Sequence, residues 1–155
     1  MPANIFISFA HVDYQTVLSI RALAKNPNHE LVFHDRSEIK PVKDKKGTPL
    51  PYPPDDIRAA PIREELKRLL QKATKMLVII SETTHESKWV NWEIQTFFDM
   101  KSNLDIDATE RIRGMIIEGC KRKELPRRIR RLRISTIEWN LAELNKWFQQ
   151  PPHFE

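Results

Sequence analysis

Residues 75–100 of the chain read KMLVIISETTHESKWVNWEIQTFFDM, and this stretch decides the fold. The apolar run at 76–80 is rich in β-branched residues and too short for an ordinary helix, which is typical of a strand buried on both faces. Beyond it the apolar spacing becomes helical, with Val90, Ile94 and Phe97 along one stripe. The stretch therefore predicts a buried strand, a turn and a helix.

Two candidates exist for the N-terminal cap of this helix. Thr83 and Glu86 stand in the [ST]-x-x-E relation of a capping box, in which each side chain bonds a backbone N–H of the first turn. Ser87 is the second candidate. The capping box predicts a helix that begins soon after Thr83.

The rest of the chain repeats the alternation of strand and helix. Five β-α repeats without a hairpin signal predict an α/β fold with a parallel sheet covered on both faces. We expect a flavodoxin-like three-layer sandwich with five strands in the order 2-1-3-4-5, whose ligand crevice lies between the first and third strands. The other strands are expected at 4–9, 30–34, 111–118 and 133–139, and the other helices at 12–23, 61–73, 123–130 and 141–148.

The length of 155 residues favours a single domain, residues 1–155, with an ordered core at about 3–149. Residues 36–60 contain five prolines and a lysine-rich turn. We expect them to form a mobile loop, and a loop of that length in a compact domain is usually functional.

Composition limits the cellular compartment and the kinds of site that we expect. The chain is 40% hydrophobic and 30% charged, as in ordinary globular proteins. Its one cysteine, Cys120, excludes an internal disulfide framework and a multi-cysteine metal site, and suits a reducing cytoplasm. No secretory apolar region and no run of membrane-spanning length is present, so we expect a cytoplasmic protein with no membrane partner.

The positive charge is concentrated in residues 121–133, where eight basic side chains face one acidic residue, Glu124. Such a block suits a polyanion, and nucleic-acid binding is one interpretation. The block lacks interleaved aromatic residues and any helix-turn-helix or RNA-binding signature. A solvated helix and connection is the interpretation we favour.

Glycine and histidine patterns exclude several kinds of site. The three glycines Gly47, Gly114 and Gly119 cannot form a dinucleotide-binding or P-loop phosphate motif. The histidines show no zinc-binding spacing, so no metal site is expected.

Glu93 stands out within the helix that follows the apolar strand. No Lys or Arg lies three or four residues away to pair with it, and its helical neighbours are Trp89, Val90, Thr96 and Phe97. It also follows the carboxyl end of a strand, where open α/β sheets bind ligands. Two interpretations remain open: a solvated helix glutamate and a functional acid.

The pattern Ser81-x5-Ser87-x-Trp89-Val90-x-x-Glu93-Ile94, together with the opening residues 5–9, resembles the TIR and TIR-like domains. It is most similar to the TIR-like proteins of the bacterial Thoeris anti-phage system, of the ThsB type. The resemblance covers nearly the whole chain and the same strand order. It implies an NAD-consuming enzyme that splits the nicotinamide–ribose bond and releases a cyclic ADP-ribose-type signal.

The resemblance also implies a set of site residues. The matching glutamate is the catalytic residue of enzymatic members, and NAD is a substrate rather than a bound cofactor. One carboxylate can suffice because nicotinamide leaves as a neutral molecule from a cationic substrate, which makes a general acid dispensable. The resemblance assigns catalysis to Glu93 and substrate binding to Ser8, Phe9, Asp35, Ser81 and Trp89.

Three of the five substrate-binding assignments have a structural alternative. Trp89 also suits a core or interface position, Ser81 the end of a strand or a helix cap, and Asp35 an Asx-turn. Family members often self-associate on activation, so the resemblance implies a homo-oligomer coupled to an effector through a nucleotide signal. A non-catalytic signalling adaptor of the same fold is the alternative function.

Overall fold

The computed structural model of the protein describes seven segments of the chain, and every structural statement below concerns them. Residues 37–51, within the expected loop, and residues 121–124, within the basic block, lie outside these segments. The described residues are 3–10, 13–22, 31–36, 52–104, 108–117, 125–138 and 140–149.

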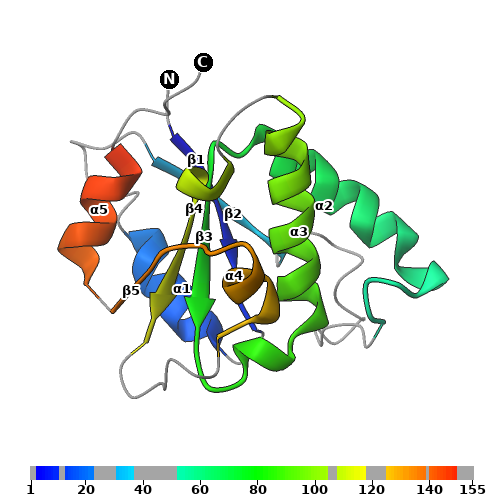
Figure 1. Ribbon diagram of the computed structural model, residues 1–155, viewed down its shortest axis with the longest axis horizontal. Coiled ribbons are helices and arrows are strands. Elements are labelled where there is room, and N and C mark those ends of the chain that lie inside the picture. The colour runs from blue at the N-terminus through cyan, green and yellow to red at the C-terminus, as the bar shows by residue number, and fades with distance from the viewer. Residues whose placement is uncertain are drawn as a thin grey trace.

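A five-stranded parallel sheet forms the centre of the structure (Figure 1). Its order is β2-β1-β3-β4-β5, which confirms the predicted flavodoxin-like topology and places the ends of β1 and β3 side by side. The strands are β1 (Ala3–Ser8), β2 (Leu31–Asp35), β3 (Lys75–Ile80), β4 (Ile112–Ile116) and β5 (Thr136–Glu138).

Helices cover both faces of the sheet, as the alternating pattern predicts. Helices α1 and α5 pack on one face, and α2, α3 and α4 on the other (Figure 1). The helices are α1 (Tyr14–Arg21), α2 (Ala60–Lys72), α3 (Lys88–Ser102), α4 (Arg127–Arg131) and α5 (Leu141–Gln149).

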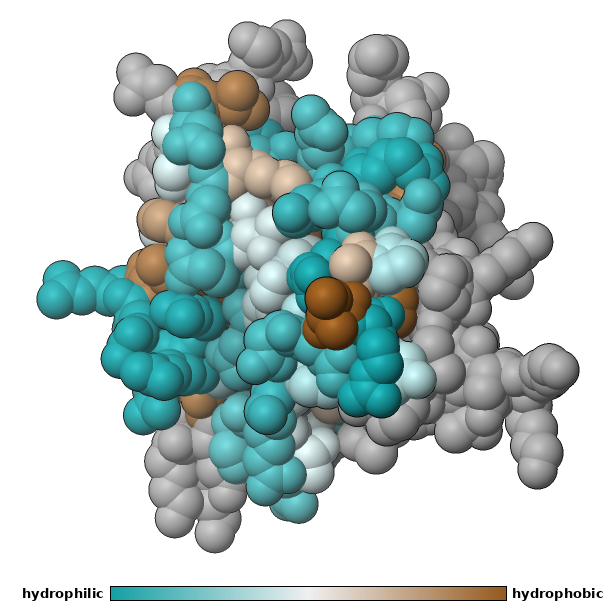
Figure 2. All heavy atoms as spheres, turned by 90° about the vertical axis from the view of Figure 1, so that its right-hand side faces the viewer, coloured by the Kyte–Doolittle hydropathy of each residue, from teal (hydrophilic) through white to brown (hydrophobic). Residues whose placement is uncertain are grey.

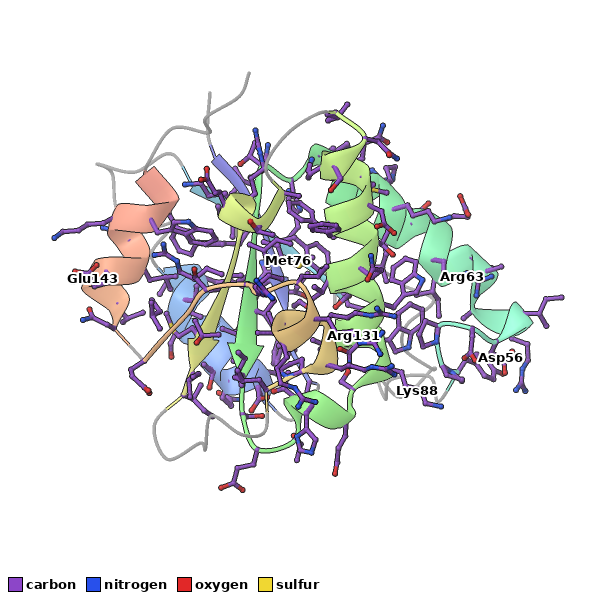
Figure 3. The ribbon with its side chains drawn as sticks, viewed as in Figure 1. Asp56, Arg63, Met76, Lys88, Arg131 and Glu143 are labelled. Carbon is purple, nitrogen blue, oxygen red and sulfur yellow. The ribbon has the colours of Figure 1, made fainter. Side chains whose placement is uncertain are left out.

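Every residue of β3 is buried, because both of its faces meet helices. Alternate side chains contribute to different cores, as the two-residue period of a strand requires. Met76 packs with the α2–α3 side (Figure 3), whereas Leu77 packs with α1 and α5. The continuous apolar run at 76–80 is thus a central strand between two apolar layers.

The capping box predicted at Thr83 is wrong. Residues Thr84–Glu86 form a short 3₁₀ turn, and α3 begins only at Lys88. Its cap is Ser87, whose hydroxyl accepts a hydrogen bond from the Val90 amide at 3.2 Å. Thr84 instead turns inward and supports Ser81, so the strand-to-helix connection is tighter than the motif suggested.

Other boundaries shift by a few residues. The expected helix at 12–23 is the shorter α1, and the expected basic helix at 123–130 is α4. Residues 52–60 are the part of the expected 36–60 loop that the structure describes at its C-terminal end. This part is partly helical, since Ile57–Ala59 form a 3₁₀ turn that leads into α2. No helix within the described ranges is long and apolar enough to cross a bilayer.

Candidate active site

Glu93 is buried beneath α3 at the carboxyl end of β1, with a side chain that is 0% exposed. The interpretation of a solvated helix glutamate is therefore wrong. Helical spacing explains the burial, since Glu93 directly precedes Ile94 and lies on the stripe that faces the sheet. The Ser8 hydroxyl, at the last position of β1, donates a hydrogen bond of 2.7 Å to Glu93 Oε1.

Arg36 supplies the positive charge that the helix itself lacks. Its guanidinium donates to Glu93 Oε1 at 2.8 Å and to the Phe9 carbonyl oxygen at 2.8 Å. The register pairs Ile7 with Asp35, so the next residue along each strand, Ser8 and Arg36, reaches the same carboxylate. Strand pairing thus brings Arg36 and Ser8 to Glu93, although they lie 57 and 85 positions away from it in the sequence.

The second oxygen of the carboxylate, Glu93 Oε2, is buried and has no hydrogen-bond partner among the described residues. An unsatisfied buried acceptor is costly, and a carboxylate can accept several hydrogen bonds. Oε1 meets two donors while Oε2 meets none within the described segments. The carboxylate is therefore held firmly at one oxygen, while the other lacks a donor from the described residues, an arrangement that suits a ligand donor such as a sugar hydroxyl.

Burial raises the pKa of Glu93 above its ordinary value of 4.5. The positive charge of Arg36 and the hydrogen bonds from Ser8 and Arg36 lower the pKa, and the negative charge of Asp35 raises it. Burial prevails over the favourable partners, because the carboxylate has exchanged its water shell for two described donors. A cationic ligand beside Glu93 would lower its pKa further and favour the ionised carboxylate.

Asp35 lies at the end of β2 with no exposed surface. The Arg21 guanidinium, at the end of α1, donates to Asp35 Oδ2 from both Nε, at 3.1 Å, and Nη2. This pair fastens α1 to the strand that carries Arg36. Asp35 is close enough to Glu93 for its charge to affect the pKa of that group, yet its own carboxylate binds Arg21.

Ser81 belongs to a neighbouring hydrogen-bonded cluster at the carboxyl end of β3. Its hydroxyl donates to Asp13 Oδ2 at 2.6 Å, and its amide donates to Thr84 Oγ1 at 2.7 Å. Burial raises the pKa of Asp13, and the Ser81 hydrogen bond opposes that rise. Sequence reasoning assigned no role to Asp13; its place just after the first strand, opposite Ser81, is the signal that could have found it.

Trp89 lies one turn before Glu93 but has partners of its own. Its indole N–H donates to the Tyr52 carbonyl oxygen at 2.9 Å, and its ring meets Trp92 edge-on with centroids 5.6 Å apart. Phe9 is buried and offers its carbonyl oxygen to Arg36 and its ring face to the same guanidinium, 5.9 Å away. Phe9 thus joins the Glu93 cluster directly, whereas the described contacts of Trp89 lead toward Tyr52.

A family model matches the part of the chain that carries this site. The family model of the Thoeris protein ThsB, TIR-like domain, matches residues 6–109. The chain belongs to this TIR-like family. The matched range includes Glu93 with its two described partners, Ser8 and Arg36, and Phe9, whose carbonyl oxygen accepts a hydrogen bond from Arg36.

Comparison with solved structures finds TIR domains. The TIR domains of the activated Roq1 resistosome, described as directly recognizing the pathogen effector XopQ, share 13% sequence identity with the chain at a TM-score of 0.46. The similar region covers 75% of this chain and 58% of that one, so the chain corresponds to little more than half of the longer protein. No curated protein matches the chain.

The side chains at this edge offer no metal centre. Within the described ranges, no three His, Cys, Asp or Glu side chains are grouped as ligands of one ion. The groups described around Glu93 are its own carboxylate, the Arg36 guanidinium and the Ser8 hydroxyl, and Asp35 and Asp13 are held by Arg21 and Ser81.

Proposed function

We propose that this protein is an NAD-consuming enzyme of bacterial anti-phage defence. It would cleave the nicotinamide–ribose bond and release a cyclic ADP-ribose-type signal that activates an effector. The observation that carries the proposal is the buried Glu93 carboxylate with one anchored oxygen and one oxygen unpartnered among the described residues. Membership of the TIR-like family of Thoeris ThsB supports it.

The chemistry requires little equipment beyond this acid. As the bond to nicotinamide breaks, positive charge moves from the pyridinium ring to the anomeric carbon and its ring oxygen. A carboxylate close to that carbon stabilises the developing charge, and in a site without water such a contact lowers the barrier by about 3 kcal/mol, or roughly a hundredfold in rate. Glu93 Oε2, which has no partner among the described residues, is the oxygen that would accept a ribose hydroxyl and face this charge.

Ser8 and Arg36 act on Oε1 and hold the carboxylate in place. Arg36 also limits access, because its guanidinium joins Glu93 to the Phe9 carbonyl and only 11% of its side chain is exposed. Substrate would therefore have to displace this guanidinium before reaching Glu93. A displaced Arg36 keeps its charge near the site, where it suits the pyrophosphate of NAD.

The product depends on which nucleophile meets the anomeric carbon. Hydrolysis uses water, whereas cyclisation uses a ribose hydroxyl or an adenine nitrogen of the same substrate. The hydroxyl loses its own proton, and an attacking ring nitrogen is neutralised by loss of a proton from the exocyclic amine. A buried carboxylate favours cyclisation, since exclusion of water leaves the tethered group as the nearer nucleophile.

The test compares wild type with Glu93→Gln, which keeps the size of the side chain and removes its charge. Cells carrying each form are infected with phage, and NAD, nicotinamide and cyclic products are measured by mass spectrometry. Wild type should consume NAD and form a cyclic product, and Glu93→Gln should lower the rate at least about a hundredfold. Glu82→Gln changes an exposed acid in the connection between β3 and α3, and this matched control should behave as wild type.

Equal NAD consumption by wild type and Glu93→Gln would contradict the proposal. Normal defence by Glu93→Gln without NAD consumption would instead identify a signalling adaptor of the same fold. Purified protein incubated with NAD and with an extract of infected cells provides the same comparison outside the cell.

A further inference from the structure

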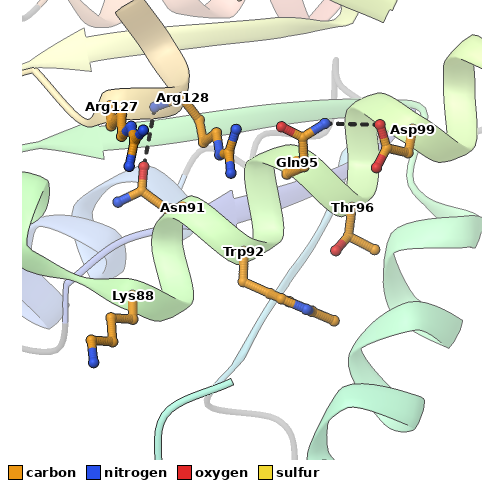
Figure 4. A pocket seen from close by; sticks show the side chains of 8 residues that line it. All are labelled: Lys88, Asn91, Trp92, Gln95, Thr96, Asp99, Arg127 and Arg128. Atoms are coloured by element: carbon orange, nitrogen blue, oxygen red, sulfur yellow. Dashed lines mark hydrogen bonds between the residues drawn. The ribbon is translucent and has the colours of Figure 1, made fainter. Parts of the chain in front are cut away.

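A hollow of about 480 Å³ lies on the outer face of α3 beside α4 (Figure 4). It faces away from the sheet, whereas Glu93 on the same helix faces toward it. Its volume falls within the range of about 300–1,000 Å³ that is typical of small-molecule sites. The lining residues are Lys88, Asn91, Trp92, Gln95, Thr96, Asp99, Arg127 and Arg128.

One asparagine fixes the two helices that form the hollow. Asn91 Nδ2 donates to the Ser87 carbonyl at 3.1 Å, and Asn91 Oδ1 accepts from the Arg128 amide at 3.2 Å (Figure 4). Ile129, 1% exposed, anchors α4 in the core between α4 and the sheet. The backbone that carries the arginines is therefore held before any ligand arrives.

The hollow has an excess of positive charge that the described residues leave unpaired. Lys88, at the start of α3, and the guanidinium groups of Arg127 and Arg128 have no hydrogen-bond or ion-pair partner within the described part of the chain. Asp99 is the one carboxylate in the lining, and it accepts a hydrogen bond of 2.8 Å from Gln95 (Figure 4). Three cations and one anion leave a net charge of +2 in the lining.

Trp92 supplies an aromatic surface within the same lining. Its ring is half-buried and meets Trp89 edge-on at an interplanar angle of 76°. The Trp89 indole is itself fixed by the Tyr52 carbonyl, so the orientation of Trp92 is supported from behind. A supported indole face is a stacking surface for a planar ring.

We propose that this hollow is a second ligand site, which binds a nucleoside phosphate. Arg127 and Arg128 would bind the phosphate, since paired guanidinium groups match its oxygens. The base would stack on Trp92, and the Gln95–Asp99 pair would accept and donate hydrogen bonds to the ribose or the base edge. The proposal does not depend on NAD cleavage, because the hollow and Glu93 lie on opposite faces of α3.

A small ligand fits the hollow better than a macromolecule does. Single-stranded nucleic acid binds along successive aromatic side chains, whereas this lining contains one. A protein partner of ordinary size is favoured by a broad apolar area, but the neighbouring face that carries α2 is mostly hydrophilic, with small separate hydrophobic areas (Figure 2).

Titration calorimetry of the full chain with AMP tests the proposal, with inorganic phosphate and adenosine as partial ligands. AMP should bind at least about tenfold more tightly than either partial ligand. Arg127→Gln and Arg128→Gln should each weaken AMP binding about tenfold, the loss expected for one charge-assisted contact. Trp92→Leu retains apolar bulk and should weaken AMP binding without changing the affinity for phosphate.

Two control variants distinguish binding in the hollow from general charge attraction and from binding at Glu93. Arg130→Gln removes an equal charge from the exposed surface of α4 outside the lining and should leave AMP affinity unchanged. Glu93→Gln should also leave it unchanged, because that acid lies on the opposite face of α3. Equal weakening by Arg128→Gln and Arg130→Gln, or binding of single-stranded DNA or a polyglutamate peptide but not of AMP, would overturn the proposal.

Discussion

The two faces of α3 hold their charges in opposite ways. Toward the sheet, one acid is buried with a short hydroxyl contact and a guanidinium from a distant strand. Away from the sheet, Lys88, Arg127 and Arg128 surround an open hollow without described partners. The inner charge depends on the folded structure for its solvation, whereas water solvates the outer charges. Changes on the inner face should therefore alter stability much more than equivalent changes on the outer face.

The largest contrast should come from removing an arginine on each face. Arg36→Met leaves the buried Glu93 carboxylate without its cation, and breaking a buried pair from one side costs about 3 kcal/mol. Arg128→Met, on the outer face, should change the free energy of unfolding by about 0.5 kcal/mol or less. Urea unfolding of both variants at pH 7 measures the difference. A similar cost for both would show that Arg36 and Glu93 are not coupled.

Ser8→Ala should have the next largest effect. It removes the 2.7 Å donor to Glu93 Oε1 and leaves the guanidinium as the described donor to that carboxylate, at a cost of about 2 kcal/mol. Ser19→Ala is the matched control, because the Ser19 hydroxyl makes a weak 3.5 Å contact in an exposed position of α1. The unfolding temperature of Ser8→Ala should be well below that of Ser19→Ala. The reverse order would contradict the described cluster.

The pH dependence of stability should reveal the raised pKa of Glu93. Above the ordinary pKa of 4.5 the unfolded chain has lost this proton while the folded chain retains it, so folding stability falls as pH rises toward the folded pKa. The slope is at most about 1.4 kcal/mol per pH unit, because one proton is involved. Glu93→Gln should lack this component, and should therefore gain stability relative to wild type as pH rises from 4.5 toward the folded pKa. Parallel pH profiles for the two proteins would exclude the raised pKa.

Asn91→Ala should give the smallest of these effects. It removes two hydrogen bonds at the base of the hollow, both partly exposed, and should cost about 1 kcal/mol. Gln95→Ala, which loses one exposed contact to Asp99, should cost less than half of that. The same urea series measures both variants. An equal cost would mean that Asn91 does not anchor α4.

The sheet could be predicted well from the sequence because the local signals agreed with the tertiary structure. The apolar run of β3, the helical stripe of α3 and the absence of hairpin signals all followed from periodicity, and the strand order followed from the topology rules for parallel sheets. The misplaced cap has a physical cause. Thr84 satisfies buried groups at the end of β3, so the chain makes a 3₁₀ turn before Ser87 can begin α3.

The sequence also marked Glu93, but not the groups around it. The absence of nearby cations in the helix correctly suggested an unusual acid, yet the partner cation comes from Arg36, 57 residues away. Asp13 and Ser81 are separated by 68 residues and meet only because β1 and β3 are neighbours. Such pairs depend on strand register, which no local pattern encodes, although the predicted 2-1-3 order already placed Arg36 at the correct edge.

The position of β2 at the edge of the sheet has a dynamic consequence. β2 pairs with β1 alone among the described strands, and it ends at Asp35, directly before the arginine that covers Glu93. Edge strands separate from a sheet at a lower free-energy cost than central strands, so the covering group is attached to an edge of the sheet that opens more readily than its centre. We expect β2 amides to exchange hydrogen with solvent sooner than those of β3, and each brief opening of this strand to expose the acid without unfolding the rest of the molecule.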